Sequence, residues 1–398
     1  MSSVPPAVPA APRHYVLRMW LFYAGFFILG GISTPFFPVW LQARGLNEIE
    51  IAQVIALPQL VRVFLTPLAG FYADRAPNRR FATISILVPA AVLFLAAYPA
   101  HGFWMLLIAT GVPSILYGMA LPPVEALALT GVRRFGFDYG RMRMGGSVAF
   151  IVANLASGAL LGIFVAEDIY FFMLFAMSLA VAVAFVLPVT PPAIRALDDA
   201  VARPETRSAR EVLGNVAFLA VMLSVGAIQG SHAILYSFGS IEWHSLGYSS
   251  FEIGAFWAFG LAGEISLFAF ARPLVKWFGA HNVLLIGAGA AVLRWVLFPL
   301  VPPLGFAGFA LTMALHGLTF GATYLGAQQT IARMIPEKMT ASAQGIFAMV
   351  TGVAMAISTS LAGPIYHALG IDGFFVMAPV AAVALLVLLV VRRQATAG

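Results

Sequence analysis

Six ionisable side chains interrupt long apolar segments of this sequence. Glu125 and Arg143 bracket a short arginine-rich stretch, and the other four, which each stand among apolar residues, are Arg62, Glu264, Arg294 and His316. A charge at the centre of a membrane helix costs at least about 2.5–3.5 kcal/mol, so such groups usually face a cavity or a partner. A carboxyl group in that setting can exchange a proton, and a guanidinium can hold a carboxylate through two parallel hydrogen bonds. The pattern indicates a binding site for a charged small molecule that also handles protons.

The composition places these side chains in a membrane. The chain has 398 residues, of which 61% are hydrophobic and 10% charged, with a mean hydropathy of +0.93. Soluble domains carry about a quarter charged residues. The absence of cysteine excludes disulfides, thiol chemistry and cysteine-ligated metals. The first 12 residues form a Pro/Ala tail without a basic start, so we expect no cleavable signal.

Apolar windows long enough to cross a bilayer predict an all-α protein with twelve transmembrane helices. They lie near 15–42, 49–72, 81–99, 103–130, 144–165, 168–189, 215–240, 249–275, 280–300, 304–333, 341–366 and 372–391. We therefore expect a tail (1–14), a six-helix bundle (15–189), a polar central loop (190–214), a second six-helix bundle (215–391) and a short tail (392–398).

The positive charges predict the topology, because cytoplasmic loops carry an excess of Lys and Arg. One side receives all the loop arginines and lysines except Arg44. They are Arg13, Arg18, Arg75, Arg79, Arg80, Arg133, Arg134, Arg141, Arg195, Arg203, Arg207, Arg210, Arg272, Lys276, Arg333, Lys338, Arg392 and Arg393. We expect both termini in the cytoplasm, a bacterial inner membrane as the location, and a functional monomer. The net charge of +6 is thus a topology signal, and nucleic acid is not a predicted partner.

The two halves resemble each other. Residues 45–65 align with 247–267 at a shift of 202, sharing a glycine and a Glu-Ile pair, and Arg62 falls opposite Glu264. Duplicated halves are typical of transporters in which the substrate path runs between the repeats near the bilayer midplane.

One loop carries a resemblance to a known family. "GFYADRAPNRR" at 70–80 resembles the signature loop between helices two and three of the major facilitator superfamily, and its echo at 272–279, "RPLVKWFG", is degraded. The resemblance implies that the loop residues form a conformational latch that does not touch substrate. The residues concerned are Gly70, Asp74, Arg75, Arg79 and Arg80.

The ionisable residues resemble one branch of that superfamily, the lactose permease branch. "PPVEAL" and "YGRMRMGGS" place Glu125 and Arg143 on its sugar-holding pair, separated by the same eighteen residues. "AGEISLFAFARPLVKWFGAHNVLL" places Glu264 on its essential carboxylate of helix eight. "AAVLRWVLF" and "TMALHGLTFGATYLGAQQTIARMIP" place Arg294 and His316 on its helix-nine arginine and helix-ten histidine.

Helix ten departs from the sugar permeases at two positions. Met313 stands where those permeases have a lysine, and Thr319 stands where they have the proton-carrying glutamate. "LHGLTFGATYLGA" resembles instead the 3-phenylpropionate transporter group of the same branch. This resemblance moves the expected substrate from a galactoside to a small organic acid.

Each candidate also has a purely structural interpretation. Glu125 could be a helix-end carboxylate paired with loop arginines, and Glu264 could form a fixed ion pair with Arg294 or Arg143. His316 could be satisfied by a neighbouring hydroxyl, and Arg62 could brace helices two and eleven. On helix seven, Gln229, His232 and Tyr236 recur at i, i+3 and i+7, which predicts a shared face toward the cavity.

Together these features predict a secondary transporter that imports a small organic acid such as 3-phenylpropionate by proton symport. Glu264, with His316, would carry the proton, and the substrate would bind between the halves; no cofactor other than the proton and no metal is expected. The alternatives are a sugar or nucleoside symporter, a drug exporter, or a receptor that kept the fold. An enzyme is disfavoured because the chain lacks an H-E-x-x-H motif, and a primary pump because it lacks a G-x-x-x-x-G-K-[ST] loop.

Overall fold

The computed structural model describes residues 11–190, 214–335 and 340–397, and every regular element in these ranges is helical. Most of the predicted central loop and of the first tail therefore lies outside the described residues, as do Arg195, Arg203, Arg207, Arg210 and Lys338. The first half contains α1 Tyr15–Ala43, α2 Glu48–Arg75, α3 Arg79–Leu95, α4 Phe103–Met119, α5 Leu121–Phe135, α6 Tyr139–Leu160 and α7 Ile169–Ala184. The second contains α10 Val216–Gly230, α11 Ala233–Ser245, α12 Ser250–Ala269, α13 Ala271–Phe278, α14 Ala280–Leu297, α15 Gly305–Ala314, η4 Gly317–Ala322, α16 Thr323–Met334, α17 Thr340–Leu369 and α18 Met377–Ala397.

Each predicted window corresponds to one helix or to two or three helical elements in series. In the described residues, ten helical runs are long and apolar enough to cross a bilayer, and one of them, Ala343–Val391, contains both α17 and α18. The remaining window is α3, which has 17 residues. Four windows contain an interruption, as between α4 and α5, where Pro122 and Pro123 follow the break. Proline lacks the N–H that an uninterrupted helix requires at this point.

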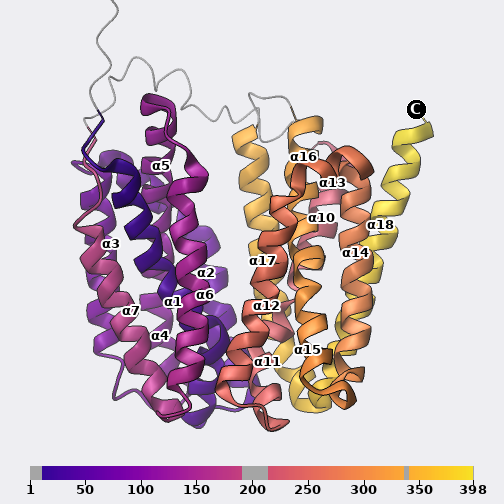
Figure 1. The fold of residues 1–398 in the computed structure, drawn as a ribbon, viewed down its shortest axis with the longest axis horizontal. Helices are drawn as coiled ribbons and strands as arrows, with labels where there is room; N and C mark the ends of the chain where they lie inside the picture. The colour runs from indigo at the N-terminus through magenta and orange to yellow at the C-terminus, as the bar shows by residue number, and fades with distance from the viewer. Residues whose placement is uncertain (1–10, 191–213, 336–339, 398) are drawn as a thin grey trace, which may run out of the picture.

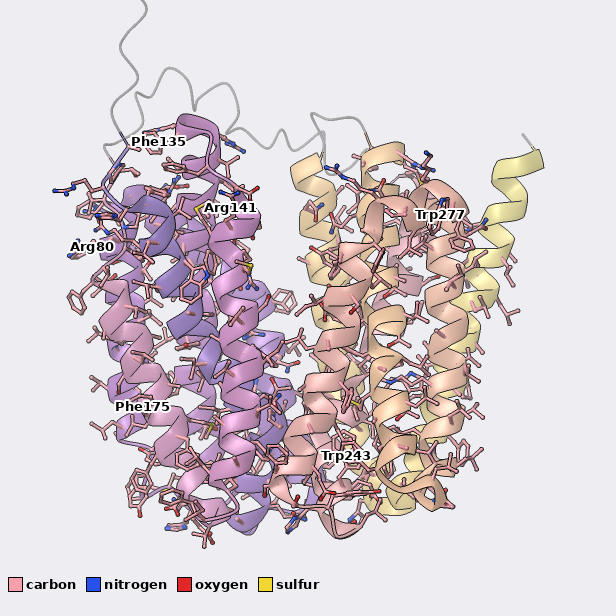
Figure 2. The ribbon with its side chains drawn as sticks, viewed as in Figure 1. Arg80, Phe135, Arg141, Phe175, Trp243 and Trp277 are labelled. Atoms are coloured by element: carbon pink, nitrogen blue, oxygen red, sulfur yellow. The ribbon has the colours of Figure 1, made fainter. Side chains whose placement is uncertain are left out.

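The helices form two bundles side by side, α1–α7 and α10–α18 (Figure 1). We call the end at which α1 begins and α18 ends the terminal end, and the opposite one the far end. Figure 2 shows Arg80 and Arg141 at the terminal end and Trp243 toward the far end. The gathering of arginines at one end agrees with the charge pattern of the sequence.

The repeat is visible in the local structure of α2 and α12. Asn47 accepts a hydrogen bond from the Glu50 backbone N–H while the Glu50 carboxylate accepts one from Asn47. Ser249 and Glu252 form the same reciprocal capping box at the start of α12, 202 residues later. Each box satisfies backbone donors that the first helical turn leaves free, so both helices begin at equivalent positions.

The halves pack together at the far end through glycines. A Cβ on Gly158 of α6 would lie 2.5 Å from the Ser250 carbonyl oxygen, and one on Gly363 of α17 would lie 2.7 Å from Ala52. Small residues allow this close approach of helix backbones. His367 and Glu48 add a contact of 2.9 Å between α17 and α2. Toward the terminal end the two bundles diverge (Figure 1).

Candidate functional site

A central cavity of about 560 Å³ lies between the two halves. Four of the predicted site residues line it: Arg143, Tyr236, Glu264 and His316. Glu125 and Arg294 are not among its lining residues. Six Phe, Tyr and Trp side chains also line the cavity: Phe27, Phe37, Phe150, Tyr236, Trp257 and Phe320. The cavity therefore combines a few charges with a large apolar surface, as small-molecule sites generally do.

A helical hairpin brings Glu125 and Arg143 together. Helix α5 ends at Phe135 and is capped by Gly136, whose φ of +68° is easily adopted by glycine. Asp138 then caps α6 by accepting a hydrogen bond of 2.8 Å from the Arg141 backbone N–H. The Nε atom of Arg143 consequently lies 3.9 Å from Oε1 of Glu125.

Both members of this pair have further contacts. The Tyr139 hydroxyl donates a 2.8 Å hydrogen bond to Glu125, and the Arg143 guanidinium carbon lies 3.9 Å from the centroid of the Phe27 ring. A guanidinium over an aromatic face is attracted by the ring electrons. Arg143 is thus held between a carboxylate and a ring at the edge of the cavity.

Two glycines place Glu264 beside His316. The backbones of Gly263 on α12 and Gly317 on η4 approach so closely that a Cβ on either would overlap the other helix. The chain after His316 forms a π-helical turn, a feature frequent at functional sites. The Nε2 atom of His316 lies 3.9 Å from the Glu264 carboxylate, and no other ion pair of Glu264 occurs in the described residues.

Arg294 is fully buried and is bound by neutral groups only. Its Nη1 donates to Nδ1 of His316 at 3.1 Å and to the Thr319 hydroxyl at 3.2 Å, and its Nη2 donates to the Met313 sulfur at 3.2 Å. Within the described part of the chain it forms no ion pair. Because arginine can only donate, Nδ1 of His316 must accept, and the proton of a neutral His316 lies on Nε2, toward Glu264.

Thr319 connects this network to His232, in the break between α10 and α11. Its hydroxyl lies 2.8 Å from Nε2 of His232, while Nδ1 of His232 lies 2.9 Å from the Ile228 carbonyl oxygen. A carbonyl can only accept, so Nδ1 donates and Nε2 accepts from Thr319. Met313 and Thr319, the two departures from the sugar permeases, are both acceptors for Arg294.

The predicted face of Gln229, His232 and Tyr236 does not meet a single cavity. Tyr236 lines the central cavity, whereas His232 is fully buried and lines neither described cavity. Gln229 lines a second cavity of about 670 Å³ and donates to Thr323 at 3.0 Å. The reason is that α10 ends at Gly230 and α11 begins at Ala233, so one helical periodicity does not run through all three residues.

The signature loop ties α3 to α5. The Arg79 guanidinium donates to the Ala126 carbonyl at 3.1 Å and to the Thr130 hydroxyl at 2.6 Å. Arg75 donates to the Phe71 carbonyl within its own helix, and Asp74 is exposed. The loop does not line the central cavity. Its role as a latch stays a prediction.

Glu242 and Asn154 are buried polar residues that the sequence pattern did not predict. Glu242 is 6% exposed and accepts a 2.6 Å hydrogen bond from the Tyr366 hydroxyl. Asn154 is fully buried at the contact between α6 and α12. Glu242 lies just beyond the end predicted for helix seven, at residue 240. The only sequence signal for Asn154 is that an asparagine stands inside an apolar window.

Comparison with known proteins identifies the family. The profile of the MFS_1 like family matches residues 16–377. The chain belongs to the major facilitator superfamily. A "Probable 3-phenylpropionic acid transporter" of Escherichia coli (strain K12) is 30% identical over 369 residues, covering 90% of this chain and 93% of that protein. A maltose permease of Geobacillus stearothermophilus is 26% identical and covers 95% of each chain.

Solved structures show the same fold. The crystal structure of the nucleoside transporter NupG aligns with a TM-score of 0.81 at 18% identity, covering 96% of this chain and 98% of that one. The predicted superfamily, the two-bundle helical fold and the resemblance to the 3-phenylpropionate transporter group are confirmed. This member of the major facilitator superfamily is a multi-pass membrane protein and a secondary transporter.

Proposed function

We propose that this transporter imports a small monocarboxylate with an aromatic or apolar body, together with a proton, by alternating access. The observation that carries the proposal is the lining of the central cavity, which combines two guanidinium groups, Arg62 and Arg143, and one carboxylate, Glu264, with six Phe, Tyr and Trp side chains. A guanidinium matches a carboxylate in geometry and charge, and the rings provide apolar surface for the rest of the molecule. The name of the Escherichia coli relative is consistent with such a substrate.

The charges between the halves favour an anion. The deep cations are Arg62, Arg143 and Arg294, and the deep carboxylates are Glu125 and Glu264. With both histidines of the network neutral, one positive charge is left over while Glu264 is ionised, and two are left over once Glu264 is protonated. In either state the excess positive charge attracts an anion such as a monocarboxylate.

The proton is assigned to Glu264. Its carboxylate borders the cavity, its nearest ionisable neighbour is His316, and no arginine forms an ion pair with it in the described residues. A carboxyl group without a fixed cationic partner can be charged in one step of a cycle and neutral in another. Thr319 stands at the position of the proton-carrying glutamate of the sugar permeases. It cannot carry the proton in place of that glutamate, because a threonine hydroxyl does not ionise near neutral pH.

We further propose that the protein works as a monomer in the bacterial inner membrane with both termini in the cytoplasm. In that orientation the terminal end is cytoplasmic, and the structure, packed at the far end, faces inward. The arginines gathered at the terminal end support this orientation.

Transport by the purified protein in liposomes tests the proposal. Labelled 3-phenylpropionate should enter at a saturable, protein-dependent initial rate that rises when the lumen is made alkaline. Empty liposomes are the necessary control, because the neutral acid diffuses through lipid under a pH gradient. Saturable uptake of disaccharides or nucleosides, with none of carboxylates, would overturn the proposal.

A further inference from the structure

The three deep arginines differ in what already binds them. Arg294 is fully buried, and its Nη atoms are bonded to His316, Thr319 and Met313. Arg143 has Glu125 at 3.9 Å and the Phe27 ring against its guanidinium. Neither is free to serve as the main partner of an incoming anion.

Arg62 is in a different position. It stands in the middle of α2, its side chain is exposed, and it lines both the central and the second cavity. Among the described residues, no hydrogen bond, ion pair or ring contact of its guanidinium is found. A charge at this depth is costly unless an opposite charge or hydrogen-bond acceptors compensate it. In the described residues no side chain provides that compensation for Arg62.

The repeat places Arg62 across the cavity from the proposed proton carrier. Arg62 on α2 and Glu264 on α12 occupy equivalent positions of the two halves, 202 residues apart, and both line the central cavity. Yet they form no ion pair within 4.0 Å. The space between Arg62 and Glu264 suits a substrate anion. The anion would bind to Arg62 when Glu264 is protonated and therefore does not repel it.

We propose that Arg62 is the residue that binds the carboxylate of the substrate, at the junction of the central and second cavities. This inference rests on the proposed function and names the anchor within it. The ligand class is a monocarboxylate whose single charged group meets Arg62 while its apolar body lies against the shared ring of Phe320 and the aromatic wall. Arg143 then has the lesser task of holding the hairpin of α5 and α6.

The glycine opposite Arg62 provides a second way to test the assignment. The Arg62 side chain lies across Gly118 of α4, where an added Cβ would be 2.5 Å from its Cδ and 2.8 Å from its Nη1. Gly118→Ala therefore displaces the guanidinium without removing its charge. Such a change should be tolerated in folding because the displaced atoms are near the end of a flexible side chain.

The experiment compares the binding of 3-phenylpropionate and of its neutral amide to the purified protein by calorimetry. The variants are Arg62→Gln, Arg62→Lys and Gly118→Ala, and Arg133→Gln is the matched control on the exposed last turn of α5. Arg62→Gln should weaken carboxylate binding about 10- to 150-fold, as expected for the loss of hydrogen bonds to a charged group, and should leave binding of the amide unchanged. Arg62→Lys should lose less, and Gly118→Ala should show an intermediate loss confined to the carboxylate.

Two results would overturn the inference, and each is separable from failure of the proposed function. In the first, Arg62→Gln and Gly118→Ala bind the carboxylate as tightly as the control. In the second, they lose the acid and the amide equally, which would indicate a general effect on the cavity. If the unmodified protein and the control bind sugars or nucleosides and no carboxylate, the proposed function itself is wrong.

Discussion

Asn154 should set the balance between the two access states. Its side chain is fully buried between α6 and α12 at the packed far end, and neither its Oδ1 nor its Nδ2 has a hydrogen-bond partner in the described structure. Gly254 of the opposite half covers it, since a Cβ there would lie 3.4 Å from Oδ1. Leaving a buried polar group unpaired costs about 1–3 kcal/mol. When the halves separate at the far end, water reaches the amide and this cost disappears.

Asn154→Ala should therefore favour the state that is closed at the far end. Truncation removes two unpaired polar groups but also some packing contacts. We therefore expect the free-energy difference between the states closed and open at the far end to shift by about 1–2 kcal/mol, which is a factor of roughly 5–30 in the ratio of their populations. Ser157→Ala is the matched control. Ser157 is also buried on α6, but its hydroxyl is satisfied by the Asn154 carbonyl at 3.1 Å within the same helix, so its loss should leave the balance unchanged.

The absence of native cysteine makes a clean distance measurement possible. Cysteines replacing His101, between α3 and α4, and Leu304, before α15, put one exposed spin label at the far end of each half. Pulsed electron paramagnetic resonance then gives the fraction of molecules with separated far ends. Asn154→Ala should lower the ratio of open to closed molecules about 5- to 30-fold relative to the labelled parent. If Asn154→Ala leaves this ratio unchanged or raises it while Ser157→Ala behaves as the parent, the unpaired Asn154 amide does not destabilise the state closed at the far end, and the reasoning is refuted.

Three further changes have defined outcomes. Glu264→Gln should abolish acceleration of uptake by a pH gradient while exchange of substrate across the membrane at equal pH continues; gradient-driven uptake at the normal rate would remove Glu264 from coupling. His367→Gln should raise the far-end-open fraction in the same spin-label assay by less than about fivefold, because the contact with Glu48 is largely exposed and exposed pairs contribute at most about 1 kcal/mol. Glu242→Ala should lower the melting temperature more than Glu242→Gln, because only the glutamine keeps an acceptor for the buried Tyr366 hydroxyl; equal melting temperatures would contradict this.

The helices were predictable because the bilayer imposes a length and a polarity on each of them. The Glu125 and Arg143 contact was also within reach of sequence reasoning, since a hairpin between α5 and α6 brings together residues on either side of its turn. The interruption at residues 231–232 was not predictable from the apolar pattern, because both α10 and α11 are apolar across it. For that reason the apolar pattern places Gln229 and Tyr236 on one face, although they line different cavities.

Helix ten shows a second limit of sequence reasoning. Met313 and Thr319 stood out only as departures from the sugar permeases, and nothing in the sequence indicated that both would accept hydrogen bonds from Arg294. All the described hydrogen-bond partners of Arg294 lie on helix ten, and which side chains of that helix face Arg294 depends on helix rotations that a linear pattern does not contain. The π-helical turn after His316 is one such rotation.

In the proposed cycle, the duplication of the chain has a direct electrostatic consequence. The same position of each half, Arg62 in one and Glu264 in the other, faces the central cavity with opposite charge. While Glu264 is ionised, a second carboxylate in the cavity is repelled by it as well as attracted by Arg62. Once Glu264 is protonated only the attraction remains, so the substrate binds well only together with the proton. Glu264→Gln should accordingly bind 3-phenylpropionate more tightly than the unmodified protein, and adding Arg62→Gln should weaken binding about as much as Arg62→Gln does alone; a double variant that binds as tightly as Glu264→Gln would place the anchor elsewhere.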